Sequence, residues 1–204
     1  MSRLARFFTT ALLAVLLVSV LAACGSVAST TTQTQAPGMQ TFSITDQLNG
    51  TLSVSAPTGT FSKGDPADGT LTLGTTEASL SAADTSIFSA GQWGLSLGAL
   101  PTNIAKALVP EGQTLTPQIV VDSIKAQMAA AVTQVTFGSS TTVTIGGHPA
   151  ARVTGTSPQG DVLLLAVDLG NSYLLTTGVT AKGELTTREA LLTQIAGSAT
   201  YTTK

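Results

Sequence analysis

The stretch that decides the fold runs from residue 142 to residue 179 and reads TVTIGGHPAARVTGTSPQGDVLLLAVDLGNSYLLTTGV. It contains four runs of strand length, at 142–145, 150–156, 162–167 and 173–179. Short segments rich in glycine, proline, asparagine and serine separate them, and these residues form tight turns. Such short turns join neighbouring antiparallel strands, so the stretch predicts a four-stranded antiparallel meander.

The third of these runs, Val162–Val167, is apolar at every position. A strand with one wet face alternates between apolar and polar residues, whereas a strand covered on both faces does not. The run therefore predicts a central strand with a layer on each side. The alternative interpretation is a strand that lines a pocket for an acyl chain.

Alternating patterns upstream predict further strands at 52–56, 70–73, 93–99 and 134–137. Trp93 lies on the apolar face of the third of these runs, which favours a core position over a ligand platform. Two segments have helical spacing instead. Thr116 and Pro117 are typical of a helix start, and an apolar stripe follows at Val120, Val121, Ile124, Met128 and Ala131.

The second helix is predicted to start at 186–189, which reads Thr-Thr-Arg-Glu and resembles a capping box, and to end at Gly197. A shorter helical turn is expected at 103–108. Strands with helices at separate places indicate an α+β fold, in which helices cover an antiparallel sheet of about six to eight strands.

The N-terminus has the pattern of an export signal. Arg3 and Arg6 precede an apolar run at 7–23, and the run closes with Leu21-Ala22-Ala23-Cys24. This ending resembles the lipobox of bacterial lipoproteins. The resemblance implies that diacylglycerol joins the Cys24 sulfur, that cleavage follows Ala23, and that Cys24 becomes the new N-terminus.

Two alternatives to this prediction are an uncleaved transmembrane helix at 7–23 and an ordinary signal peptide with an incidental cysteine. Cys24 is the single cysteine of the chain, which favours lipid attachment there. Two or more acyl chains anchor a protein stably, so we expect a lipid-anchored protein on the extracytoplasmic side of the cell membrane or the outer membrane. Gly25 follows the cysteine, so the aspartate that retains some lipoproteins at the inner membrane is absent.

The predicted organisation has three parts. Residues 1–23 are the signal peptide, 24–40 are the lipidated cysteine with a flexible tether rich in Thr, Ser and Gln, and 41–204 are one globular domain. The 16 tether residues after Cys24 have a root-mean-square reach of about 20–24 Å.

Composition bears on the partners of the domain. Charged residues make up 10% of the chain, and the part after residue 23 carries 7 basic and 11 acidic side chains. Nucleic-acid binding needs a concentrated basic patch, so no nucleic-acid partner is expected. A polybasic grip on anionic lipids is disfavoured for the same reason.

Three segments have a recognisable pattern: the strand and Pro-x-Gly turn at 52–59, the segment at 144–152, and the ending at 192–198. Together they resemble the PsbP-like α/β/α sandwich superfamily, which includes bacterial lipoproteins. Many members have a Trp shortly after Pro-x-Gly, where this chain has Thr60-Phe61. The resemblance implies an accessory or protein-binding role, and it supplies no shared catalytic residue.

Candidate chemistry is sparse. His148 is the single histidine, in a Gly-Gly-His-Pro turn, and a Ser-His-Asp triad would need Asp161 or Asp168 beside it. We expect an exposed turn histidine and no catalytic residue. A single His, with Cys24 taken by lipid, is too few ligands for a zinc site. The loop at 65–69, with Asp65 and Asp68, lacks the ligand series of a calcium loop. No metal or cofactor is therefore expected.

The sequence thus predicts a non-enzymatic lipoprotein that acts as an accessory or protein-binding module with an envelope protein partner. The alternative is a carrier of a small apolar ligand or lipid, held in a cavity between the sheet and the Thr116 helix. Val121, Ile124 and Leu164 would line that cavity.

Overall fold

The computed structural model describes residues 38–47, 50–80, 88–109, 112–131 and 134–203, and its strands form two antiparallel sheets. The smaller sheet has the order β1-β2-β11, and the larger has the order β3-β4-β5-β10-β9-β8-β6, with β7 also paired to β8. The strands of the smaller sheet are β1 (Met39–Thr45), β2 (Gly50–Pro57) and β11 (Thr200–Thr203). Those of the larger sheet are β3 (Phe61–Asp65), β4 (Thr70–Gly74), β5 (Trp93–Pro101), β6 (Thr136–Phe137), β7 (Thr141–Ile145), β8 (His148–Thr156), β9 (Gly160–Asp168) and β10 (Ser172–Ala181).

The predicted meander is confirmed. Strands β7, β8, β9 and β10 pair in succession, and each pair is antiparallel. Strand β5 then pairs with the free edge of β10, although some seventy residues separate these two strands in sequence. The sequence pattern predicts pairing between strands joined by short turns. It does not predict this long-range pairing, which joins β3, β4 and β5 to the meander.

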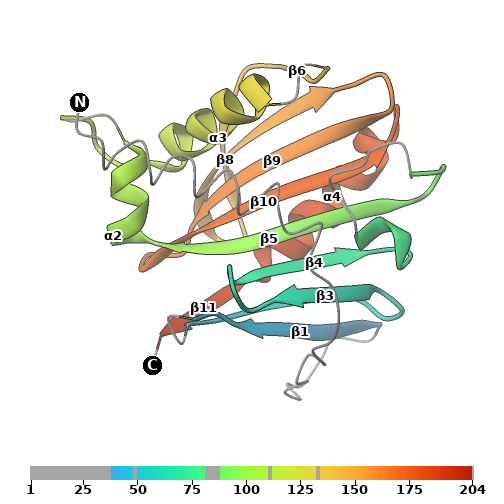
Figure 1. Cartoon of the computed structure of the whole chain (residues 1–204), viewed down its shortest axis with the longest axis horizontal. Coiled ribbons are helices and arrows are strands. Elements are labelled where there is room, and N and C mark those ends of the chain that lie inside the picture. Colours follow the sequence, from blue (N-terminus) through green and yellow to red (C-terminus); the bar gives the residue numbers. More distant parts are fainter. Residues whose placement is uncertain (1–37, 48–49, 81–87, 110–111, 132–133, 204) are drawn as a thin grey trace.

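Helices lie on both faces of the larger sheet (Figure 1). We call the face that carries α3 (Pro117–Ala131) the front face and the face that carries α4 (Leu185–Gly197) the rear face. The short helix α2 (Thr102–Ala105) continues into the 3₁₀ turn η3 (Lys106–Leu108), and a second 3₁₀ turn, η1 (Ala78–Leu80), follows β4. This arrangement confirms the predicted α+β class.

Strand β9 shows why both layers are needed. Its residues 160–167 are all buried. Leu164 and its even-numbered neighbours belong to the front core with α3, whereas Leu163 and Leu165 belong to the rear core with α4. The prediction of a central strand covered on both faces is therefore confirmed.

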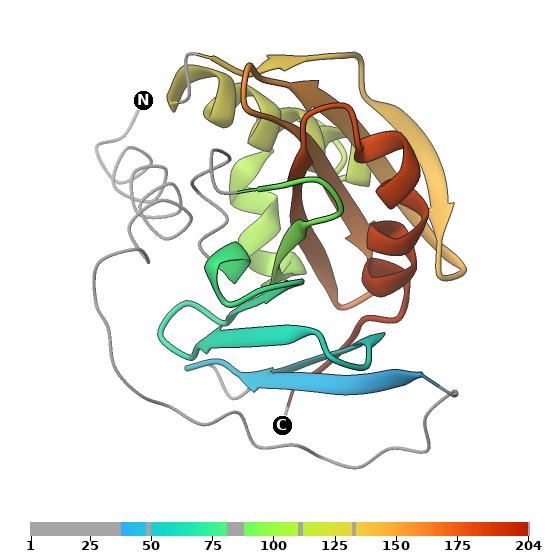
Figure 2. The ribbon, with the colours of Figure 1, turned by 90° about the vertical axis from the view of Figure 1, so that its right-hand side faces the viewer.

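The smaller sheet packs on the rear side beside α4 (Figure 2). Val54 of β2 and Tyr201 of β11 share one core cluster with Leu73 of β4 and Leu192 of α4. The sequence missed β1 and β3, because neither has a clean apolar alternation. Strand β1 also begins at Met39, so two residues assigned to the tether lie in the sheet.

The two long helices begin differently. The Thr116 hydroxyl accepts a hydrogen bond from the Ile119 N–H at 3.3 Å, which confirms the predicted cap of α3. Helix α4 starts at Leu185 without a side-chain cap from its N-cap residue, so the predicted capping box at 186–189 is wrong. Instead, Asp161 at the start of β9 accepts hydrogen bonds from the N–H groups of Gly183 at 2.8 Å and Leu185 at 3.4 Å.

Candidate functional site

The residues with the clearest predicted chemistry lie outside the described part of the chain. The structure does not describe Ala23, Cys24, the rest of the predicted signal peptide, or the tether up to residue 37. Among the described residues, no helix is long and apolar enough to cross a membrane. The lipid-attachment site therefore stays a prediction from sequence.

The triad alternative at His148 is not assembled in the fold. His148 opens β8 and is partly buried rather than exposed. Asp161 lies opposite Thr156, at the far end of the β8–β9 pair from His148. Asp168 lies nearer, but the strand register directs it to the front face, where it accepts a hydrogen bond from the Tyr173 hydroxyl at 3.4 Å, whereas His148 shares the rear face with Ile145.

The carboxylates of the loop between β3 and β4 accept hydrogen bonds from backbone N–H groups of the same loop and its end. Asp65 accepts a hydrogen bond from the Ala67 N–H, and Asp68 accepts one from the Thr70 N–H, both at 2.9 Å. Burial raises the pKa of Asp68, which the hydrogen bonds to Thr70 oppose. In the described ranges no three His, Cys, Asp or Glu side chains gather into a metal-binding group. The loop is accounted for by turn formation.

The residues proposed to line a ligand cavity lie between α3 and the front face. Val121 and Leu164 are fully buried, Ile124 is nearly so, and all three belong to one cluster with Val153 and Ala166. Trp93 belongs to the rear cluster and is 3% exposed, which confirms its core position.

Polar side chains at the edges of the helices hold them to the sheet. Arg152 of β8 forms an ion pair with Glu189 of α4. On α3, Asp122 accepts a hydrogen bond from the Ser140 hydroxyl at 2.6 Å, and Lys125 donates one to the Gly138 carbonyl at 2.7 Å. The ion pair joins α4 to β8, and the two contacts of α3 join that helix to the loop between β6 and β7.

The front face of β10, β5, β4 and β3 carries two rows of residues that the sequence analysis missed, and four of these residues bear hydroxyl groups. The first row runs across the strands through Thr177, Ser96, Thr72 and Lys63. The second runs through Leu175, Gly98, Thr70 and Asp65. We call these eight residues the hydroxyl rows.

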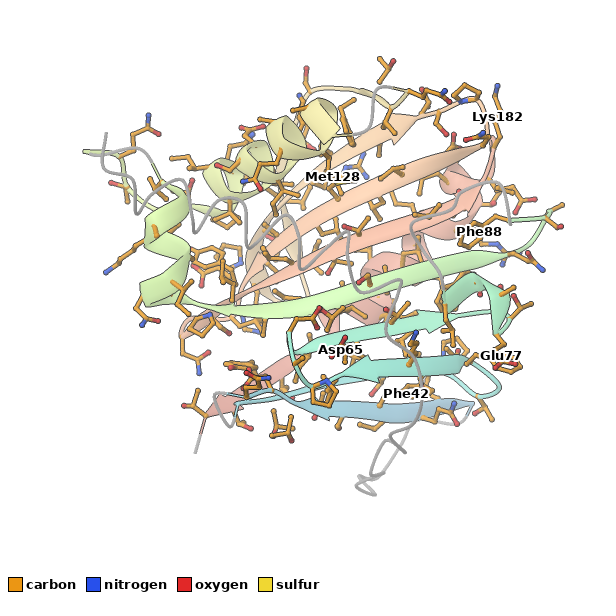
Figure 3. The ribbon with its side chains drawn as sticks, viewed as in Figure 1. Phe42, Asp65, Glu77, Phe88, Met128 and Lys182 are labelled. Atoms are coloured by element: carbon orange, nitrogen blue, oxygen red, sulfur yellow. The ribbon has the colours of Figure 1, made fainter. Side chains whose placement is uncertain are left out.

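Among the described elements, helices border the hydroxyl rows and do not cover them. Helix α3 packs over β8 and β9, and α2 packs at one end of β5 and β10. At the other end, a Cβ on Gly94 would meet the Ser79 carbonyl of η1 and the ring of Phe88 (Figure 3). Among the described residues, a Cβ on Gly98 would meet only the Thr70 hydroxyl, at 4.0 Å.

This surface can donate and accept hydrogen bonds, since each hydroxyl does both. Its charges, Lys63 and Asp65, stand at the β3 end of the rows. The signal for it was present in the sequence: Thr70 and Thr72 alternate with the buried Leu71 and Leu73. What the sequence could not show is which strands lie beside β4.

Comparison with known proteins supports the fold. No family model matches the chain, and no curated protein matches its sequence. The solution structure of the cyanobacterial PsbP protein CyanoP from Synechocystis sp. PCC 6803 is similar, with a TM-score of 0.50 and 14% sequence identity over 90% of this chain and 99% of that chain. A protein of unknown function from Pseudomonas aeruginosa, described as a putative regulator, gives a TM-score of 0.37 and 12% identity over 72% of this chain and 88% of that chain.

The likeness to CyanoP covers most of this chain and nearly all of that one. It agrees with the antiparallel sheet between helical layers that the residues themselves build. The chain has a PsbP-like fold.

Proposed function

We propose that this protein is a lipid-anchored, extracytoplasmic binding module without catalytic activity, which works as an accessory to another protein of the cell envelope. The observation that carries the proposal is the sequence Leu21-Ala22-Ala23-Cys24 at the end of an apolar run, with the only cysteine of the chain in the last place. A thiol at that place is the acceptor for diacylglycerol in the proteins that the segment resembles.

The fold is consistent with a binding role. Proteins of the PsbP-like superfamily serve as accessory subunits or protein partners, and CyanoP is similar to this chain in fold. The hydroxyl rows add four hydroxyl groups and two charged side chains on a face that no described helix covers. Function drawn from fold is analogy, so the proposal depends on direct tests.

Lipid attachment is tested by labelling cells with a radioactive fatty acid. The wild-type protein is expected to carry the label and to sediment with membranes, and Cys24→Ser is expected to carry no label. An unlabelled wild-type protein, or a labelled Cys24→Ser variant, would refute the anchor.

The accessory role is tested by crosslinking in living cells and identifying what is attached. Ser96→Arg places a long charged side chain in the middle of the hydroxyl rows, and Ala190→Arg does the same on the exposed side of α4. A partner that contacts the rows is lost from Ser96→Arg and kept by Ala190→Arg.

The ligand-carrier alternative predicts a different result. A carrier purified from cells would release a lipid or small apolar molecule on solvent extraction, in an amount close to that of the protein. Mass spectrometry of the extract separates the two functions, because an accessory module releases no such molecule and the acyl chains on Cys24 stay covalently bound to the protein.

A further inference from the structure

The described chain begins beside the first residue of β3. The Gly38 carbonyl accepts a hydrogen bond from the Thr58 N–H at 2.8 Å. The Gln40 side-chain amide donates to the Thr60 carbonyl at 3.3 Å, and Phe61 follows Thr60 directly. The segment that leads to Cys24 therefore joins the domain next to Phe61.

Two large apolar side chains are exposed among the described residues: Phe61, at 47%, and Ile104, at 37%. The two lie at opposite ends of β5. Phe61 pairs with Gly74 of β4, which pairs with Gly94 near the start of β5. Ile104 lies in α2, which follows Pro101 at the end of β5. The seven residue steps from Gly94 to Pro101 span about 23 Å of strand.

We infer that the Phe61 end of β3 contacts the lipid surface when the chain is anchored through Cys24, so that the domain has a preferred orientation on the membrane. The inference rests on the proposed lipid anchor. An exposed aromatic ring is stabilised at the boundary between headgroups and acyl chains, as in amphipathic segments that lie on membranes. Of the two exposed large apolar side chains among the described residues, Phe61 is the one beside the point where the chain enters the domain.

Charge does not drive this contact. Lys63 is exposed on the same face of β3, two residues from Phe61, and Glu77 is exposed after β4 at the same end of the domain (Figure 3). Glu184 and Arg188, beside Gly91 just before β5, add one further charge of each sign, so both signs are present at this end. The contact is therefore expected to form on uncharged phosphatidylcholine and to change little with salt.

Because the chain is anchored, the single ring of Phe61 can be enough to orient the domain on the membrane. A single apolar side chain does not hold a free protein on a membrane, since even one myristoyl chain binds only marginally. A domain tied to the bilayer by a short segment meets the surface at high effective concentration, and a weak contact then selects an orientation.

The test uses the full lipidated chain in phosphatidylcholine vesicles with bromine atoms on the lipid near the headgroup. Phe61→Trp and Ile104→Trp each add one reporter, and the native Trp93 is buried, so it gives the same background in both. Emission from Phe61→Trp is expected to shift to shorter wavelength and to be quenched, while Ile104→Trp stays unquenched. The Phe61→Trp, Cys24→Ser double variant is expected to lose the quenching.

Equal quenching of both reporters, quenching at residue 104 alone, or quenching at neither would each overturn the inference. Co-flotation of the same samples with vesicles separates the two proposals. A chain that does not float lacks the lipid anchor, whereas a chain that floats with residue 61 unquenched is anchored but has no such orientation.

Discussion

The turn between β7 and β8 meets the end of α4 backbone to backbone, at Gly146 and Gly197. A Cβ on Gly146 would lie 2.0 Å from the Gly197 carbonyl oxygen, and a Cβ on Gly197 would lie 3.0 Å from the Gly146 nitrogen. Gly197 is the last residue of α4, and Ser198 continues in a right-handed conformation. The glycine predicted to end the helix is therefore needed for close approach to the turn.

This contact predicts a difference between two neighbouring glycines. Gly146 and Gly147 both have positive φ, 60° and 85°, but a Cβ on Gly147 would meet nothing within 4 Å. Gly147→Ala is expected to lower the free energy of unfolding by about 1 kcal/mol, the cost of a left-handed alanine. Gly146→Ala is expected to cost about 3 kcal/mol, because the clash adds to that strain. Urea unfolding measures both, and equal losses would contradict the close approach.

The C-terminal strand is fixed by a hydrogen bond from the Tyr201 hydroxyl to Asp46, at 2.7 Å. Tyr201→Phe is expected to lower the free energy of unfolding by about 1.5 kcal/mol, since the acceptor is a carboxylate. The matched control is Tyr173→Phe, whose bond to Asp168 is longer at 3.4 Å. A loss in Tyr173→Phe as large as in Tyr201→Phe would argue against this ranking.

The same tyrosine predicts a fall in stability at alkaline pH. Burial, then the hydrogen bond to Asp46 and its charge, raise the pKa of Tyr201 from 10.0 to about 12. Between these values the folded protein keeps a proton that the unfolded chain releases, so stability is lost as pH rises above 10. The drop in urea midpoint from pH 8 to pH 11 is expected to be smaller in Tyr201→Phe. An unchanged drop would show that other groups cause it.

The sequence and the structure give different N-terminal caps for α4. Asp161→Ala removes the carboxylate that accepts from Gly183 and Leu185, and is expected to cost about 1–2 kcal/mol. Thr186→Ala, at the predicted capping box, changes an exposed side chain and is expected to stay within about 0.5 kcal/mol of wild type. Thermal or urea unfolding of the pair decides between a cap from β9 and a cap within the helix.

These examples show what a single sequence reveals of this fold. The meander and α3 were predictable because their signals are local: turn residues, alternation, and Thr116 before Pro117. Asp161 as the cap of α4 was not, because it lies 24 residues before Leu185 and is brought there by sheet pairing. The hydroxyl rows were hidden for the same reason, since β4, β5 and β10 become neighbours only through long-range pairing.

The rear core contains a polar atom whose removal is expected to stabilise the protein. Thr176 of β10 is 3% exposed, and among the described residues its hydroxyl has no hydrogen-bond partner. Thr176→Val keeps the branched shape and removes an unsatisfied buried hydroxyl, so it is expected to raise the free energy of unfolding by about 1 kcal/mol. Thr180 is the matched control: it is fully buried on the same face of β10, but its hydroxyl donates to the Ala181 carbonyl at 3.1 Å. Because Thr180→Val loses that bond, it is expected to cost about 1 kcal/mol. If urea unfolding showed both valines destabilising by the same amount, the Thr176 hydroxyl would have to be satisfied in solution, by a bound water or by a turn of its side chain.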